Sequence, residues 1–232
     1  MVAWPLPPGL VAVRLGRRAN RFAIEAVASD GRVRRLHLPN SGRMEELLVP
    51  GAEGLADLRP GLGRRTEGTL LLVRHRGLWV GVDAHLPNHL FARAARTLEP
   101  FAAYPSVARE VAVAGERIDF VLTGPAGEFL VEVKSCNRVD DGVARFPDAP
   151  TARGTRHLEL LVRQRAAGRR AAVVWVVQRA DAERLRPFAE ADPAFARAAR
   201  AAARAGVELY AYRCRVEPTA VVLAEAIPVE VG

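Results

Sequence analysis

Residues 171–177, AAVVWVV, form an unbroken apolar run in the second half of the chain. A strand covered on both faces has such a run, whereas a strand with one solvated face alternates apolar and polar residues. The run is far shorter than the roughly 20 residues of a membrane-spanning helix. Stretches with helical spacing of apolar residues lie on either side of it, at 151–167 and 192–206. The run therefore predicts a buried strand of an α/β domain, with helices on the faces of its sheet.

The rest of the second half alternates helices and strands in a way that fits this domain. Apolar residues recur at helical spacing in LPNHLFARAARTL, residues 86–98, which predicts a first helix. Three strands follow it, at 106–115, 116–122 and 129–135, and a last strand is expected at 207–216. The whole order predicts a mixed sheet in a domain of residues 84–232.

The first part of the chain has a different pattern, with short strands that glycine and proline separate. RFAIEAV and RVRRLHL flank Asp30-Gly31, a dipeptide typical of β-hairpins. GTLLLVRHRGLWVGVD, at 68–83, contains two more strands around Arg76-Gly77. About five short strands in such a segment predict a small antiparallel barrel, in a domain of residues 1–83.

The chain is strongly basic, with a formal net charge of +8 and a sequence pI near 10.7. Nucleic acid, DNA or RNA, is the polyanionic partner that this charge first suggests, although pI is no argument about fold. Arginines crowd the first half of the predicted barrel: Arg14, Arg17, Arg18, Arg21, Arg32, Arg34 and Arg35. They either bind a phosphate backbone, with Arg17 and Arg18 as candidates, or form a solvated surface.

Several other classes of protein are disfavoured. Cys136 and Cys214 are too few for a disulfide scaffold or a zinc site, so we expect reduced thiols. The N-terminal MVAWPLPPGL lacks the charged and apolar regions of a signal peptide. We therefore expect a soluble cytoplasmic protein without a membrane partner. Its oligomeric state, a homodimer included, is left open at this point.

The candidate catalytic residues lie around Lys134, which is the only lysine among the 34 lysines and arginines of the chain. Alternate side chains of a strand share a face, so Glu132 and Lys134 lie on one face of the strand 129–135. A hairpin turn centred between Gly124 and Gly127 would place Asp119 directly opposite Glu132.

The same alternation assigns the faces of the two predicted strands. The expected apolar face of the strand 129–135 consists of Phe129, Val131 and Val133. In the preceding strand, the expected apolar face consists of Ile118, Phe120 and Leu122. Arg117 would then lie opposite Lys134 and is a candidate for nucleic-acid binding.

Two carboxylates that face each other repel, and a cation between them relieves the repulsion. Mg²⁺ or Mn²⁺ fits Asp119 and Glu132, because Mg²⁺ binds through one or two carboxylates and keeps several waters. The compact ammonium of Lys134 could orient an attacking water and offset charge on a phosphate, which the planar arginine fork does less well. The alternative is a strand-end lysine beside two unrelated surface acids.

The motifs RIDFVL, VEVKSC and RFPDAPTARGTRHLELL resemble those of the sugar fermentation stimulation protein A family. HLPNSGRMEELLVPG near the N-terminus and GVELYAYRCRV near the C-terminus also resemble this family. The resemblance implies an N-terminal OB-fold and a C-terminal domain of the PD-(D/E)xK nuclease type. It carries the catalytic pattern onto Asp119, Glu132 and Lys134, and it adds Glu110 as a further acid.

Two features outside this pattern complete the predicted site. Many nucleases of this type have an acid on the first helix, but 86–98 has none, with Arg93 where one could lie. FPDAPTARGTRH is predicted to be a loop that leads into a helix, with Arg153, Arg156 and His157 as candidates for phosphate binding. The alternatives are a solvated basic loop capped by Thr155 and a structural role for the histidine.

Two functions remain after this argument. The first is a Mg²⁺-dependent nuclease that hydrolyses the phosphodiester bonds of DNA or RNA. The second is a DNA-binding regulator of sugar-utilisation genes without turnover, in which the nuclease-like face is kept only as structure. The arginine-rich barrel would serve either function.

Overall fold

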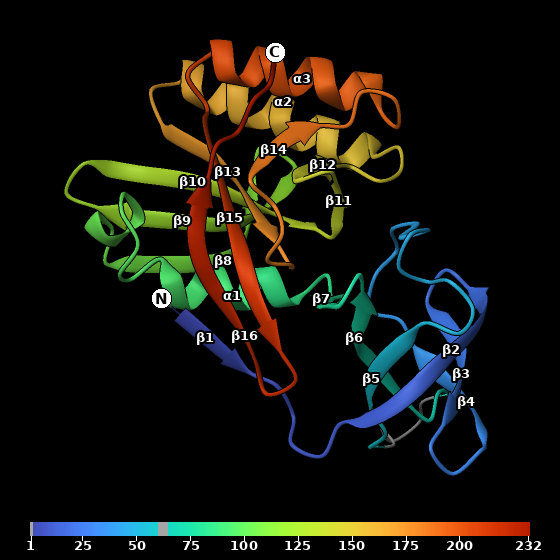
Figure 1. Cartoon of the computed structure of the whole chain (residues 1–232). Helices are drawn as coiled ribbons and strands as arrows, with labels where there is room; N and C mark the ends of the chain where they lie inside the picture. The colour runs from blue at the N-terminus through green and yellow to red at the C-terminus, as the bar shows by residue number, and fades with distance from the viewer. Residues whose placement is uncertain (1, 60–64) are drawn as a thin grey trace.

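The structure, a computed structural model, describes residues 2–59 and 65–232 (Figure 1). The first part is a barrel, coloured blue to teal in the figure, and the second is an α/β domain. The barrel sheet has the strand order β4-β3-β2-β5-β6-β7. Its strands are β2 (Val11–Asn20), β3 (Ala23–Ala28), β4 (Val33–His37), β5 (Glu53–Asp57), β6 (Gly68–His75) and β7 (Leu78–Gly81).

A parallel pairing of β4 with β6 closes β2 to β6 into a barrel, and β7 extends from β6. The prediction of a small five-stranded barrel is therefore confirmed. Closure removes the exposed strand edges that an open sheet of this size would have. The barrel core is apolar and includes Ile24, Leu36 and Leu70, none of which is exposed to solvent.

The second domain is built on a mixed seven-stranded sheet of order β1-β16-β15-β13-β10-β9-β8. β13 runs parallel to β10 and β15, and the other neighbours are antiparallel. Its strands are β1 (Val2–Pro5), β8 (Ser106–Val113), β9 (Glu116–Gly124), β10 (Gly127–Cys136), β13 (Arg170–Val177), β15 (Glu208–Glu217) and β16 (Ala220–Ile227).

Helices cover both faces of this sheet. The helices are α1 (Leu86–Ala94), α2 (Ala152–Ala166) and α3 (Pro193–Arg204), with a short 3₁₀ helix, η1, at Phe101–Ala103. Along β13, Val173 and Trp175 pack with residues of α2 and α3, whereas Val174 and Val176 pack with residues of α1. The apolar run therefore forms a strand that is buried on both faces, as predicted.

Two parts of this domain differ from the sequence-based prediction. β11 (Arg138–Asp140), β12 (Val143–Phe146) and β14 (Arg184–Pro187) form a small sheet of their own, which was not predicted. Residues 2–5 were assigned to the barrel domain, but β1 pairs with β16 at the edge of the large sheet. The assignment of residues 1–83 to one domain therefore needs this correction. The side chains of Val2 and Trp4 pack against the core on the α1 side of the sheet.

The helix ends also refine the prediction. The helix expected at 86–98 ends at Ala94. α2 begins at Ala152, where the side chain of Thr151 accepts a hydrogen bond of 3.0 Å from the Gly154 N–H. The predicted cap, Thr155, lies within the helix, so the basic residues of this segment lie on the first turns of α2. Within the described residues, none of the helices combines the length and the apolar character that crossing a bilayer requires.

Buried side-chain hydrogen bonds connect the barrel to the α/β domain. Asn40 Nδ2 lies 3.3 Å from Asn137 Oδ1 and 3.2 Å from the carbonyl of Val82. Asn137 Nδ2 in turn donates to the carbonyl of Gly81. Gln178, at the end of β13, donates to the carbonyl of Asp83 over 2.8 Å. These contacts fix the barrel beside the edge of the sheet at which β10 and β13 end.

Candidate active site

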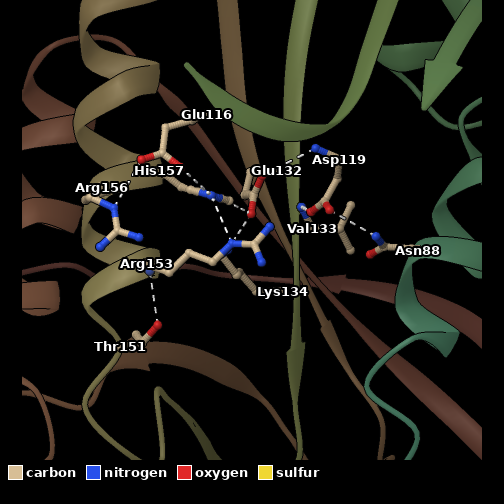
Figure 2. Close-up of polar contacts among 11 residues, drawn as sticks. Asn88, Glu116, Asp119, Glu132, Val133, Lys134, Thr151, Arg153, Arg156 and His157 are labelled. Carbon is tan, nitrogen blue, oxygen red and sulfur yellow. Dashed lines mark hydrogen bonds and ion pairs between the residues drawn. The ribbon is translucent and has the colours of Figure 1, made fainter. Parts of the chain in front are cut away.

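The candidate site lies where β9 and β10 cease to pair. Their hairpin has the predicted register, which runs up to Phe120 opposite Val131. Asp119 and Glu132 are the next residues on this register, and the Asp119 N–H lies 3.4 Å from Glu132 Oε2 (Figure 2). The two predicted acids are therefore neighbours on adjacent strands.

Asp119 is held by one contact from the backbone and one from a helix. Its Oδ2 accepts a hydrogen bond of 2.8 Å from the Val133 N–H, and its Oδ1 accepts one of 3.1 Å from Asn88 Nδ2 (Figure 2). Burial, and secondly the Glu132 carboxylate, raise the pKa of Asp119 to about 6, against the opposing effects of Lys134 and the two hydrogen bonds. The ionised form of Asp119 is thus destabilised by burial and by the neighbouring carboxylate.

Glu132 is almost fully buried, with 2% of its surface exposed. Its Oε1 accepts a hydrogen bond of 2.5 Å from Lys134 Nζ and is also in contact with His157 Nδ1. Burial acts to raise the pKa of Glu132, but Lys134 and His157 together outweigh it, so the pKa lies below its usual value. The environments of the two acids therefore push their pKa values in opposite directions.

His157 reaches this acid from α2 and is itself 1% exposed. With Nδ1–H donating to Glu132, the other ring nitrogen is free to accept the hydrogen bond of 3.3 Å from Arg153 Nε. A chain of contacts thus runs from Arg153 through His157 to Glu132 and Lys134 (Figure 2). The sequence indicated a structural histidine or a phosphate ligand, but it did not indicate this contact with the acid.

Glu110 lies on β8 beside Asp119, because its neighbours Arg109 and Val111 pair with Phe120 and Ile118. The Glu110 backbone has a φ of +55°, a left-handed conformation that is uncommon for a residue other than glycine. Its side chain is about half exposed, and its carboxylate lies 3.6 Å from Arg117.

The predicted faces are correct for β10 but wrong at one position of β9. Ile118 was expected to share a face with Phe120 and Leu122, yet it packs with Val121 in the core on the α2 side. The regular pairing of β8 with β9 is interrupted between Glu110 and Asp119, and the alternation of the strand changes there. On the other side of β9, the pairing with β10 ends at Phe120, and the Val133 N–H donates to the side chain of Asp119.

Other predicted nucleic-acid contacts are dispersed over the molecule. Arg117 is exposed, and the pairing of β9 with β10 ends before it could lie opposite Lys134. Arg156 donates to Glu116 over 3.1 Å, and Arg17 lies 3.3 Å from Glu25. The predicted nucleic-acid ligand Arg18 makes hydrogen bonds within the barrel domain. Its guanidinium donates to the carbonyls of Asn20, Arg21 and Arg43 at 3.3, 2.9 and 2.7 Å.

Sequence reasoning missed Asn88, which lies on the first turn of α1. It occupies the side of the helix that faces Asp119, whereas Arg93 donates to the carbonyl of Ala3 over 3.1 Å and stacks on Trp4. A polar side chain directly after a helix-starting proline was the available signal. α1 therefore contributes the side-chain amide of Asn88 to the site, whereas many nucleases of the predicted type have an acid on this helix.

A cleft of about 570 Å³ opens beside Lys134, between the barrel and the α/β domain. The barrel contributes Asn40, Ser41, Gly42 and Arg21 to its walls. The α/β domain contributes cationic side chains: Lys134, Arg138, Arg145 and Arg153. Arg153 is the one predicted phosphate ligand among these lining residues, and the strand-end arginines 138 and 145 were not predicted.

Among residues 2–59 and 65–232, no three His, Cys, Asp or Glu side chains gather as a preformed metal site. Asp119 and Glu132 nevertheless offer hard oxygen donors on adjacent strands, and the raised pKa of Asp119 indicates that positive charge would be stabilising there. Mg²⁺ keeps several waters and takes only one or two carboxylates, so these two residues fit it.

Comparison with known proteins identifies the family. Residues 17–82 match a family described as the SfsA N-terminal OB domain, and residues 85–220 match the sugar fermentation stimulation protein RE domain. The chain belongs to the sugar fermentation stimulation protein family. The barrel is thus the OB domain of this family, which confirms the predicted resemblance.

Relatives in this family align with nearly the whole chain. The sugar fermentation stimulation protein homologue of Symbiobacterium thermophilum is 46% identical, with 93% of this chain and 92% of the relative covered. The homologue of Moorella thermoacetica is 44% identical over 97% of this chain and 98% of its own. A solved structure, Pyrococcus furiosus SfsA in complex with Ca²⁺, is 27% identical with a TM-score of 0.91 and covers 99% of each chain.

Proposed function

We propose that this protein is a divalent-metal-dependent nuclease of the PD-(D/E)xK type that hydrolyses phosphodiester bonds of DNA or RNA. The observation that carries the proposal is the arrangement of Asp119, Glu132 and Lys134. Two acids lie at adjacent positions of neighbouring strands, and the single lysine of the chain donates to the more buried acid. Lys134 also borders a cationic cleft, in which a phosphodiester backbone would be attracted.

Asp119 and Glu132 would hold the metal ion, either Mg²⁺ or Mn²⁺. The Pyrococcus furiosus relative was solved with Ca²⁺, another hard cation that binds oxygen ligands, which supports a cation site in this family. When bound, such an ion supplies Lewis-acid polarisation of a phosphate and makes water more acidic. Glu110, the further acid that the family resemblance implies, lies on the strand next to Asp119 and would assist from there.

Lys134 would act on the attacking water and on the charge that develops at phosphorus. Its side chain is 14% exposed and borders the cleft, while Glu132 fixes its ammonium through the hydrogen bond of 2.5 Å. A preorganised donor of this kind stabilises developing negative charge without having to reorient during the reaction. The cation is therefore poised between the acids and the substrate cleft.

The surrounding residues would keep both acids in place. The Val133 N–H and Asn88 each occupy one oxygen of Asp119, so its carboxylate is restrained in orientation. His157 contacts Glu132 Oε1 and so restrains this carboxylate. Arg153 donates to the other ring nitrogen of His157 and restrains the imidazole in turn. Outer contacts of this type orient the groups that bind a metal.

Cleavage of labelled DNA and RNA, with Mg²⁺ or with EDTA, tests the proposal. We expect cleavage by the unchanged protein only with the metal, and loss of cleavage in Asp119→Ala and Lys134→Ala. Equal cleavage by all three proteins would show that the site is wrongly assigned. Tight DNA binding that Asp119→Ala leaves intact, without cleavage by any of the proteins, would favour the non-catalytic regulator.

A further inference from the structure

We infer that the substrate of this site is single-stranded nucleic acid, bound in the cleft between the two domains. The inference rests on the proposed nuclease function and adds the class of substrate. Lys134 borders the cleft, so a strand that occupies it would lie beside the proposed catalytic residues. The width, charge and lining of the cleft all bear on which nucleic acid it accepts.

The two walls of the cleft are fixed relative to each other. Beyond the Asn40–Asn137 contact, the Met44 N–H of the barrel donates to Asp148 Oδ2 over 3.0 Å. The Gly81 N–H, at the end of β7, donates to the carbonyl of Gln178 over 2.9 Å. Widening the cleft would break several of these hydrogen bonds together, and their buried groups would be left unsatisfied.

The size of the cleft favours a single strand. Pockets of about 300–1,000 Å³ enclose ligands the size of a small molecule, and the cleft, at about 570 Å³, lies in this range. A nucleotide or a short strand is of that size. A duplex carries two backbones around its stacked base pairs and is a much thicker object, so its strands would have to separate before one of them entered the cleft.

The far end of the cleft is built for an anion. Arg138 and Arg145 are directly opposite each other in the pairing of β11 with β12, an arrangement in which like charges repel. Arg138 donates to Asp140 over 2.9 Å, but Arg145 Nε is buried without a hydrogen-bond acceptor among the described residues. A phosphate in the cleft would be attracted to both guanidinium groups and would offset their repulsion.

The barrel also offers an aromatic ring on which a nucleotide base could stack. Arg21, which lines the cleft, is exposed at the turn between β2 and β3, and the next residue, Phe22, has 49% of its surface exposed. Exposed aromatic side chains beside cations bind single strands by stacking on unpaired bases, whose faces a duplex does not present. Arginines on both walls would therefore contact phosphates, and Phe22, next to the lining residue Arg21, would offer an exposed ring to a base.

Equilibrium binding in EDTA tests the inference without requiring catalysis. A labelled oligonucleotide of ~12 nucleotides, in the size range that such grooves bind, is titrated by anisotropy as single-stranded DNA, single-stranded RNA and the matching duplexes. We expect at least one single strand to bind about tenfold or more tightly than either duplex. Equal or tighter binding of a duplex, or no binding of any single strand, would overturn the inference.

Variants locate the bound strand. Arg145→Ala is expected to weaken single-strand binding about tenfold, because a charged hydrogen bond is lost. Arg21→Ala and Phe22→Ala, both at exposed positions where folding is not at risk, should each weaken it about fivefold. Arg204→Ala, at an exposed position on the last turn of α3, removes the same charge away from the cleft and should have no effect. An effect of Arg204→Ala equal to those of the cleft variants would place the strand elsewhere and overturn the inference.

The two proposals can fail separately. Selective binding of single strands without cleavage in Mg²⁺ would support the cleft assignment and contradict the nuclease. Metal-dependent cleavage that proceeds equally on a duplex would support the nuclease and overturn the single-strand assignment.

Discussion

An acid–cation cluster lies near each end of the paired strands β10 and β13, and the two clusters differ in the cation. At one end, Arg170 donates to both carboxylate oxygens of Glu208, over 2.5 and 2.8 Å, and its guanidinium stacks on Phe129. At the other end, Lys134 donates to one oxygen of Glu132. The planar fork of arginine holds a carboxylate in a fixed geometry, whereas an ammonium is a compact point charge.

This difference indicates what each cluster is for. The guanidinium of Arg170 is committed to its acid and to an aromatic ring, which suits a structural tie between β13 and β15. Lys134 borders an open cleft and donates to only one oxygen of Glu132, whose other oxygen has a single long contact of 3.4 Å with the Asp119 N–H. The single lysine of the chain therefore lies at the cluster that we propose to bind metal and substrate.

The largest expected effect comes from exchanging the cation at the second cluster. Lys134→Arg keeps the charge, but the bulkier fork does not fit between Glu132 and the cleft, so cleavage should fall about 100-fold or more. The melting temperature should change little. Cleavage rates and thermal unfolding measure the two effects. If Lys134→Arg cleaved as fast as the unchanged protein, the account of why a lysine is needed at this cluster would be wrong.

Loosening the contact behind Glu132 should have a smaller effect. His157→Gln removes the imidazole that restrains this acid, and we expect the affinity for Mg²⁺ or Mn²⁺ to fall about tenfold. Glu159→Gln, at an exposed position of the same helix, is the control and should bind as before. Calorimetric titration with Mn²⁺ measures the affinity. If His157→Gln bound the metal as tightly as the unchanged protein, the histidine would only stabilise the fold and would not position Glu132.

Acidification should weaken metal binding at the second cluster. Because the pKa of Asp119 is raised to about 6, the metal-free site is mostly ionised at pH 7.5 and mostly protonated at pH 5. A proton on Asp119 competes with the metal, so the affinity for Mn²⁺ should be about tenfold lower at pH 5. The same titration at the two pH values checks this. An affinity that is independent of pH would exclude Asp119 as a ligand with this pKa.

Removing Arg170, the cation of the first cluster, should lower the unfolding free energy and leave the cleavage rate unchanged. Arg170→Ala takes two hydrogen bonds from Glu208, which is partly exposed and keeps Tyr210, so we expect a loss of about 1–2 kcal/mol in unfolding free energy. Arg169→Ala, at an exposed neighbouring position, should cost less. Urea unfolding measures the loss. A reduced cleavage rate per folded Arg170→Ala molecule would contradict the separation of the two clusters.

Local pattern was enough to predict the elements around the site. The Gly124–Gly127 turn set the hairpin register, and alternation within β10 placed Glu132 and Lys134 on one face. The apolar run of β13 predicted a strand covered on both sides. The hairpin register, the faces of β10 and the burial of β13 each depend on a few residues that are close together in the sequence, so they can be predicted from it.

The missed features depend on contacts between distant segments. Val2 pairs with Leu223, and β4 closes the barrel against β6, neither of which leaves a local signal. The contact of Asn88 with Asp119 depends on how α1 packs on the sheet. The face of Ile118 departs from the alternation that the prediction assumed, at the point where the pairing of β9 with β8 is interrupted beside Glu110.

A crystal structure of the protein soaked in Mn²⁺ tests the central claim most directly. Anomalous scattering locates the metal independently of the protein atoms. The account predicts a single strong peak bonded to the carboxylates of both Asp119 and Glu132, with the ammonium of Lys134 beside it. A peak at another site, or an empty position between these two acids at saturating Mn²⁺, would contradict it.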